Sequence, residues 1–212
     1  DGVIKDSVNI KTDAFVELFH GYGSSVIDKI IEHHTSNGGM SRFKKIPIYA
    51  NFAGLNLSEI EIEKYANKFS ELVVSKVVNS KWVPGIEKVL QNKPINQKFI
   101  LVSATPDDEL KYILKSLNND KTFDFIYGSN TKKSDAISSS IKLLKIQNSD
   151  CIMFGDALAD LEAAQKNNID FILRQHDTNS DMNLLHNGIK IPNFLNYESI
   201  RINFKNPKKI TQ

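Results

Sequence analysis

From about residue 85 onward, short apolar runs alternate with amphipathic segments, and this alternation limits the folds open to the chain. Four short apolar runs indicate strands, at residues 99–102, 123–127, 151–154 and 171–173. Three intervening segments carry apolar residues at helical spacing, at residues 107–117, 134–144 and 158–167. Strands that alternate with helices favour a parallel sheet with right-handed crossovers. We therefore predict an α/β core built on a doubly wound, Rossmann-like parallel sheet.

Residues 12 to 80 have a different pattern, with helical spacing and no clear strand. The expected helices lie at residues 14–19, 25–33 and 58–78. Ser58 and Glu61 fit a capping box at the start of the third of these helices. A Trp-Val-Pro-Gly turn at residues 82–85 marks the return to the alternating region. We predict an all-helical cap at residues 11–81, inserted into an α/β core formed by residues 1–10 and 82–212.

Composition sets limits on location and partners. The 212 residues are 41% apolar and 25% charged, as in an ordinary globular domain, and the net charge of +2 argues against a nucleic-acid or acidic-membrane partner. The one cysteine, Cys151, permits no disulfide within the chain and is predicted as a small core residue of a strand. We expect a cytoplasmic monomer or homodimer with no membrane span, and a solvated, frayed tail at residues 206–209.

Two aspartates follow the apolar run at residues 151–154. The run continues as Gly155-Asp156, and Asp160 comes four residues later. Asp156 would leave the carboxyl end of a strand, where open α/β sheets place their sites. Two carboxylates one helical turn apart could share a hard cation such as Mg²⁺. The alternative is that Asp156 caps the helix and Asp160 is a favourable first-turn charge.

Two further segments end strands with groups that suit a phosphate. The run at residues 99–102 is followed by Ser103-Ala104-Thr105, where a hydroxyl and free backbone N–H groups could meet phosphoryl oxygens. Lys132 and Lys133 open a helix, where a cation is unfavourable unless it serves an anion. The alternatives are a plain turn of small residues and two solvated lysines. The pattern does not decide which lysine would contact the phosphate.

The chain begins Asp-Gly-Val-Ile-Lys-Asp-Ser at residues 1–7. Together with Ser-Ala-Thr, the lysine before a helix and Gly-Asp-x-x-x-Asp, this segment resembles the ordered motifs of the haloacid dehalogenase superfamily. A helical insertion after the first motif resembles members with a helical cap, including phosphoglycolate phosphatase-like and β-phosphoglucomutase-like phosphatases. The order and spacing of the motifs cover essentially the whole chain.

The resemblance implies a magnesium-dependent hydrolase that removes phosphate from a small phosphorylated metabolite through a phosphoaspartate intermediate. The substrate would be a sugar phosphate or a phosphoglycolate-like acid. The family's motifs assign catalytic roles to Asp1, Ser103 and Lys133, a substrate contact to Ala104, and metal ligation to Asp1, Asp156 and Asp160. The family's nucleophile would stand two residues before Asp1, at a position that the printed sequence does not contain.

The cap segment at residues 33–45 is rich in glycine and polar residues. Its Gly-x-Ser-Arg core resembles the cap loop of β-phosphoglucomutase, which implies substrate contacts from Gly39, Ser41 and Arg42. The alternative is a polar helix-to-helix turn with solvated basic residues. His33 and His34 are expected to interact with the dipole at a helix end rather than to bind a metal.

Other reactions of the superfamily stay open. Lys11 stands where the mutase places a histidine that faces the cap, and Gly155-Asp156 stands where the mutase typically carries Glu-Asp. These differences favour a phosphatase over a sugar-phosphate mutase. A chain without a nucleophile would instead be a non-catalytic protein that binds a phosphorylated metabolite.

Overall fold

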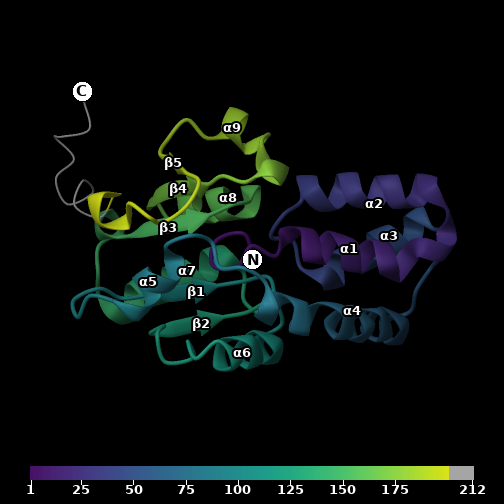
Figure 1. The fold of residues 1–212 in the computed structure, drawn as a ribbon, viewed down its shortest axis with the longest axis horizontal. Helices are drawn as coiled ribbons and strands as arrows, with labels where there is room; N and C mark the ends of the chain where they lie inside the picture. The colour runs from purple at the N-terminus through teal and green to yellow at the C-terminus, as the bar shows by residue number, and fades with distance from the viewer. Residues whose placement is uncertain (201–212) are drawn as a thin grey trace.

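The computed structural model describes residues 1–200, and its chain forms two lobes (Figure 1). One lobe is helical and contains α1 (Val8–Phe19), η1 (His20–Tyr22), α2 (Ser24–Ser36), α3 (Arg42–Phe52) and α4 (Glu59–Asn79). The other lobe holds all the described strands. The predicted tail at residues 206–209 lies outside the described residues.

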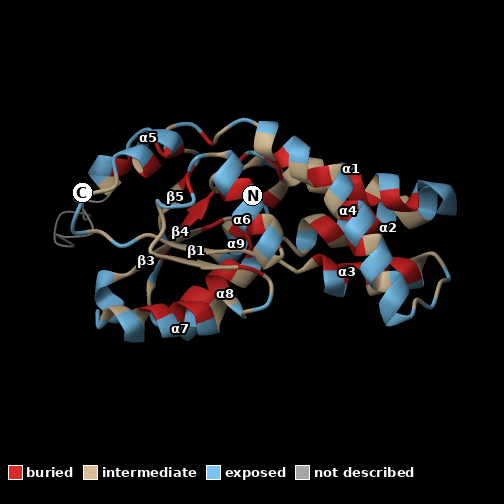
Figure 2. Ribbon diagram, turned by 90° about the horizontal axis from the view of Figure 1, so that it is seen from below, coloured by how far each residue is buried: buried red, intermediate tan, exposed pale blue. Residues whose placement is uncertain are grey.

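The second lobe is an α/β core. Its strands are β1 (Ile100–Val102), β2 (Phe125–Tyr127), β3 (Ile152–Gly155), β4 (Asp170–Arg174) and β5 (Lys190–Ile191). Its helices are α5 (Ile86–Gln91), α6 (Asp107–Ser116), α7 (Lys133–Leu144), α8 (Leu158–Lys166) and α9 (Met182–Leu185), with the short turns η2 (Asn148–Asp150) and η3 (Asp177–Asn179). Strand β1 pairs with β2, and β3, β4 and β5 pair in that order, all in parallel. Helix α5 lies on one face and α7 and α8 lie on the other (Figure 2), which confirms the predicted doubly wound core.

A cavity of about 1010 Å³ separates β1 from β3. Side chains of both strands line it, among them Leu101 and Phe154, and so do Val3 and Ile4 near the start of the chain. Polar side chains of the cap and the core also line it, and we call the part bordered by Asp1, Lys11, Arg42, Lys45, Ser103, Lys133 and Asp156 its polar end. The described sheet is therefore in two parts, and both parts border the compartment that holds the candidate site.

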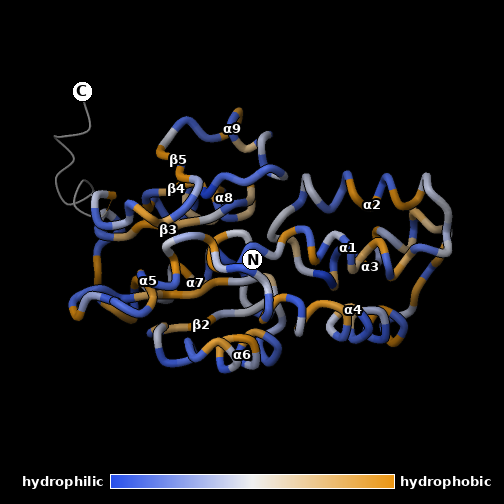
Figure 3. The backbone as a smooth tube through the Cα atoms, viewed as in Figure 1, coloured by the Kyte–Doolittle hydropathy of each residue, from blue (hydrophilic) through white to orange (hydrophobic). Residues whose placement is uncertain are grey.

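Packing of aromatic rings holds the helical lobe together. Phe15 of α1 stacks against Phe69 of α4 with 4.2 Å between ring centroids, and meets Tyr49 of α3 edge-on at 4.9 Å. Ile113 of α6 joins the same cluster of buried side chains, so the apolar core of the cap continues into the α/β lobe. In Figure 3 hydrophobic and hydrophilic stretches alternate along α1, α2 and α4, as expected for helices that bury one face.

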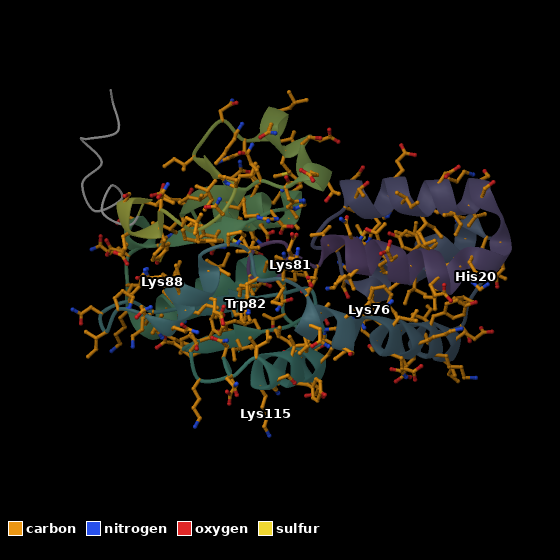
Figure 4. The ribbon with its side chains drawn as sticks, in the orientation of Figure 1. His20, Lys76, Lys81, Trp82, Lys88 and Lys115 are labelled. Atoms are coloured by element: carbon orange, nitrogen blue, oxygen red, sulfur yellow. The ribbon has the colours of Figure 1, made fainter. Side chains whose placement is uncertain are left out.

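The chain crosses between the lobes at two segments that lie side by side. The Val83 amide donates to the Ile4 carbonyl at 3.0 Å, and the Asp6 amide donates to the Lys81 carbonyl at 2.9 Å. The Lys5 ammonium lies 4.4 Å from the centroid of the Trp82 ring. Figure 4 labels Lys81 and Trp82 on the second crossing. The observed crossings at residues 4–6 and 81–83 fit the predicted domain boundaries, which stay a prediction.

Most predicted elements are present, and the capping box is confirmed by the hydrogen bond from the Ser58 amide to Glu61 Oε2 at 2.8 Å. Helix α3, the short helices α5 and α9 and the strand β5 were not predicted. Cys151 was predicted inside a strand core, but it precedes β3, is half-buried and donates to the Gln147 carbonyl at 3.4 Å. None of the described helices is both long and apolar enough to span a membrane.

Candidate active site

Asp156 stands at the carboxyl end of β3, as predicted. The helix α8 can fold back here because Gly155 has no Cβ, and an added Cβ would overlap the side chain of Asp160. Asp156 Oδ2 lies 3.1 Å from His176 Nε2, and its Oδ1 receives no hydrogen bond from any described residue. Burial by itself raises the pKa of Asp156, but the His176 hydrogen bond and nearby positive charge lower that pKa overall. The carboxylate is therefore ionised, with one oxygen open.

Asp160 has partners for both of its carboxylate oxygens. Its Oδ1 lies 2.5 Å from Lys133 Nζ. Its Oδ2 accepts from the backbone amides of Asp156 at 3.3 Å and Ala157 at 3.2 Å, at the start of α8. The carboxylate thus caps the helix and fixes the lysine, which matches the capping alternative. These contacts make Asp160 a positioning residue for Lys133, and the metal ligation expected of it stays a prediction.

Two donors hold the Asp1 carboxylate from opposite sides. Ser7 Oγ, which is fully buried, donates to Asp1 Oδ1 at 2.5 Å, and the Lys11 ammonium pairs with Oδ2. Lys11 also donates to Thr105 Oγ1 at 3.3 Å, so the first segment of the chain is tied to the end of β1. Burial, followed by the charge of Arg42, lowers the pKa of Lys11 to about 8. These contacts bring together the first and second sequence motifs.

Asp156, through its open Oδ1, and Asp1, through its backbone carbonyl, suit a magnesium ion as a ligand pair. Gly2 has a φ of +71°, and a Cβ on it would overlap the Asp156 carboxylate, so this carboxylate lies against the backbone next to Asp1. Among residues 1–200, no three Asp, Glu, His or Cys side chains converge as a metal cage. Mg²⁺ is commonly held by one or two carboxylates and keeps several waters, so the oxygen donors present suit that ion.

This close approach makes Gly2→Ala a sharp test of the site. We expect the methyl group to displace the Asp156 carboxylate and to reduce turnover by about 100-fold, the typical cost of misplacing a reacting group by 1 Å. Gly54→Ala is the matched control, because Gly54 has a similar φ of +74° but nothing within 4 Å of the added Cβ. Both variants should lose about 1 kcal/mol of stability to backbone strain. Equal activity in the two variants would contradict the geometry.

Ser103, Ala104 and Lys133 line the polar end of the cavity together. Ser103 follows β1, and its Oγ accepts from the Thr105 amide at 3.1 Å. Lys133 opens α7 and reaches the cavity, whereas Lys132 is exposed. The geometry therefore selects Lys133 over Lys132 as the lysine that can face a phosphate.

The glycine loop of the cap lies against the core. Gly39 has a φ of +78°, and a Cβ on it would lie 3.0 Å from Lys133 Nζ. A Cβ on Gly38 would lie 3.1 Å from the Cβ of Ala157. Gly39 lines the cavity, while Ser41 takes the N-cap position of α3 without a side-chain capping bond. The loop therefore closes the cap over the lysine.

Arg42 lines the cavity but is not a free cation, and the substrate contact expected of it stays a prediction. Its guanidinium makes two hydrogen bonds to Glu109 of α6, at 2.8 and 2.6 Å, and one to Ser70 of α4 at 2.5 Å. It also stacks on Phe69, 4.5 Å from the ring centroid. The side chains of Arg42 and Glu109 are 4% and 9% exposed. Arg42 therefore joins two cap helices to the core, and its charge is already matched.

Three residues near the site escaped prediction. His176 holds Asp156, and Asn179 donates to the Asp156 carbonyl at 2.8 Å and to the Arg174 carbonyl at 2.9 Å. Both follow β4, so the rule that picked Asp156, a polar residue after a parallel strand, could have found them. Lys45, in the first turn of α3, lines the cavity and is 2% exposed. No signal in the sequence separated it from the neighbouring surface lysines.

Comparison with known proteins gives a consistent result. Residues 1–174 match the family model of haloacid dehalogenase-like hydrolases. A β-phosphoglucomutase structure from Clostridium difficile is 25% identical, with 98% of this chain and 95% of that chain covered and a TM-score of 0.77. A family IA, variant 3 haloacid dehalogenase hydrolase from Entamoeba histolytica is 17% identical, covers 97% and 96%, and has a TM-score of 0.76.

A third similar structure is CbbY from Rhodobacter sphaeroides in complex with phosphate, which is 14% identical over 92% of this chain and 91% of that chain, with a TM-score of 0.72. A search of curated protein sequences found no match. The family model spans most of the chain and contains every motif from Asp1 to Asp160. The fold is the one shared by phosphatases and phosphomutases of this kind, and the chain belongs to the haloacid dehalogenase-like hydrolases.

Proposed function

We propose that this protein is a magnesium-dependent phosphatase that hydrolyses small phosphate monoesters. The observation that carries the proposal is the convergence of Lys133, fixed by Asp160, with the Asp1 and Asp156 carboxylates around one end of a cavity. A lysine held beside two carboxylates and a strand-end hydroxyl suits a phosphoryl group that needs both a cation clamp and a metal. The family membership supports the same class of reaction.

Each side chain has a definite task in this proposal. Asp156 and Asp1 would hold Mg²⁺, which supplies charge neutralisation so that an anionic nucleophile can approach a phosphate. Lys133 and the Ser103 hydroxyl would bind the equatorial phosphoryl oxygens. Asp1, oriented by Ser7 and Lys11, would protonate the leaving oxygen and then take a proton from the attacking water. The family's motif implies that the nucleophile would be a carboxylate two residues before Asp1.

A sugar-phosphate mutase is the second candidate. The 25% identity to a β-phosphoglucomutase over nearly the whole chain favours it. Two ion pairs argue for hydrolysis. Lys11 stands where the mutase resemblance predicts a histidine, and it is paired with Asp1. Arg42 stands where that resemblance predicts a substrate contact, and it is paired with Glu109. Incubation of a sugar monophosphate with a trace of sugar bisphosphate separates the two functions, since a mutase gives net isomerisation and a phosphatase gives free phosphate.

The first experiment is phosphate release from a panel of small phosphomonoesters, on protein whose intact mass has been measured. With Mg²⁺ present we expect release from sugar phosphates or small phosphorylated acids, and with EDTA we expect it to fall to the uncatalysed rate. A protein whose mass includes an aspartate two residues before Asp1, and which still releases no phosphate with Mg²⁺, would contradict the proposal. In that case a non-catalytic protein that binds phosphorylated metabolites would be the better description.

A further inference from the structure

The cationic side chains at the polar end of the cavity are almost all paired with acids. This end is lined by four of them: Lys11, Arg42, Lys45 and Lys133. Three have carboxylate partners, Asp1, Glu109 and Asp160 respectively for Lys11, Arg42 and Lys133. Within residues 1–200 no carboxylate oxygen lies within 4.0 Å of the Lys45 ammonium. Lys5 also lines the cavity without a carboxylate partner, but its ammonium lies 4.4 Å from the centroid of the Trp82 ring. Among the described residues, Lys45 has neither a carboxylate partner nor a cation–π contact for its ammonium.

Lys45 is deeply buried, and its contacts do not supply a negative charge. Its Nζ lies 2.9 Å from His34 Nδ1 and 3.3 Å from the His34 carbonyl oxygen. An ammonium has three N–H donors, so one donor has no acceptor among the described residues. Burial, with Lys45 as the second cause, lowers the pKa of His34 to about 2, so this imidazole is neutral. The countercharge of Lys45 is missing.

A buried cation without a countercharge is costly, and the surroundings of Lys45 do not explain why a lysine stands there. Lys45 shares the buried face of α3 with Ile46, Tyr49 and Ala50, where a leucine or methionine would pack without a desolvated charge. Burial, and secondly the charge of Lys11, lower the pKa of Lys45 to about 7. An anion beside the ammonium would offset this penalty and restore the charged form.

The position of Lys45 links it to the phosphate end of the cavity. It follows the glycine loop whose Gly39 approaches Lys133, and both lysines line one compartment. We infer that Lys45 binds a second anionic group of the substrate, so that the substrate carries a carboxylate or a second phosphate besides the phosphoryl group held at Lys133. This inference rests on the proposed function, and it assigns to Lys45 the role that the sequence suggested for Arg42.

The test is equilibrium binding by calorimetry in EDTA, so that no probe is hydrolysed. The probes are ethyl phosphate, with one anionic group, phosphoglycolate, with an added carboxylate, and glucose 1,6-bisphosphate, with an added phosphate. For wild-type protein we expect at least one of the two doubly anionic probes to bind about 10-fold tighter than ethyl phosphate, the usual gain from a hydrogen bond to a charged group. Which of them gains identifies the second anion.

Lys45→Met should remove that preference, and Lys44→Met is its matched control. Lys44 is the exposed neighbour on the same helix, so its variant changes net charge equally without touching the cavity. We also expect thermal unfolding of Lys45→Met at or above the wild-type temperature, because an apolar chain of similar length replaces a buried charge. A Lys45→Met protein that keeps the preference would overturn the inference.

The wild-type protein alone can also overturn it, by binding all three probes equally, whether or not any variant folds. The outcome separates this inference from the proposed function. Phosphate release without a preference for doubly anionic probes would contradict the inference about Lys45 and would still support the phosphatase function. A preference that depends on Lys45, in a protein that releases no phosphate, would uphold the subsite and remove the phosphatase.

Discussion

Asp156→Asn should abolish magnesium-dependent phosphate release while leaving the fold intact. The substitution keeps the shape of the side chain and its contact with His176, but it removes the negative charge that would hold the metal. We expect turnover to fall on the order of 10³-fold, which is about 4 kcal/mol of transition-state stabilisation. Steady-state phosphate release over a range of Mg²⁺ concentrations measures this loss.

Asp120→Asn is the control for this prediction, because Asp120 is exposed and does not line the cavity. Its activity should match wild type. Denaturant unfolding should place the stability of both variants within about 1 kcal/mol of wild type. Near-normal release from Asp156→Asn with full dependence on Mg²⁺ would rule out Asp156 as a metal ligand and would require another residue in that role.

Glu109→Gln should destabilise the protein by about 3 kcal/mol, the usual cost of leaving one member of a buried ion pair without its partner. The guanidinium of Arg42 would keep its contacts with Ser70 and Phe69 but would lose the carboxylate that balances its charge. Because Arg42 belongs to the cap and Glu109 to the core, the loss should also loosen the attachment of the two lobes. Urea unfolding measures the stability change, and hydrogen exchange in α3 and α6 measures the loosening.

Asp108→Asn is the matched control on the same helical turn. Asp108 pairs with Lys111 at 3.6 Å, and both side chains are largely exposed, so the change should stay within about 0.5 kcal/mol. The double variant Arg42→Met with Glu109→Leu should recover most of the stability, since it removes both buried charges at once. If the stability losses of Arg42→Met and Glu109→Leu, each made singly, simply add in the double variant, the pair does not act as a unit.

The α/β core could be predicted from the sequence because its strands are short apolar runs and its helices have one apolar face. The same local rules placed Asp156, Ser103 and Lys133 at strand or helix ends, where the structure has them. Each of these predictions depends on residues close together in the chain.

Helix α3 was hidden because two positions of its buried face hold Arg42 and Lys45, which interrupt the apolar period, and Pro47 lies inside it. A buried cationic side chain needs polar partners, and these partners can be far away along the chain. Glu109 meets Arg42 from 67 residues away, and His34 meets Lys45 from 11. A local sequence pattern does not predict such partners.

The sequence by itself determined the strands, most of the helices and the motifs that end them, because burial of apolar side chains leaves a periodic signal. Tertiary structure alone decided how the charges are shared. It placed Asp160 on Lys133, Arg42 on Glu109 and Lys11 on Asp1, and it left Lys45 without a counterion. The physical reason is that an ion pair is chosen by distance in space and by desolvation, and neither quantity is encoded by spacing along the chain.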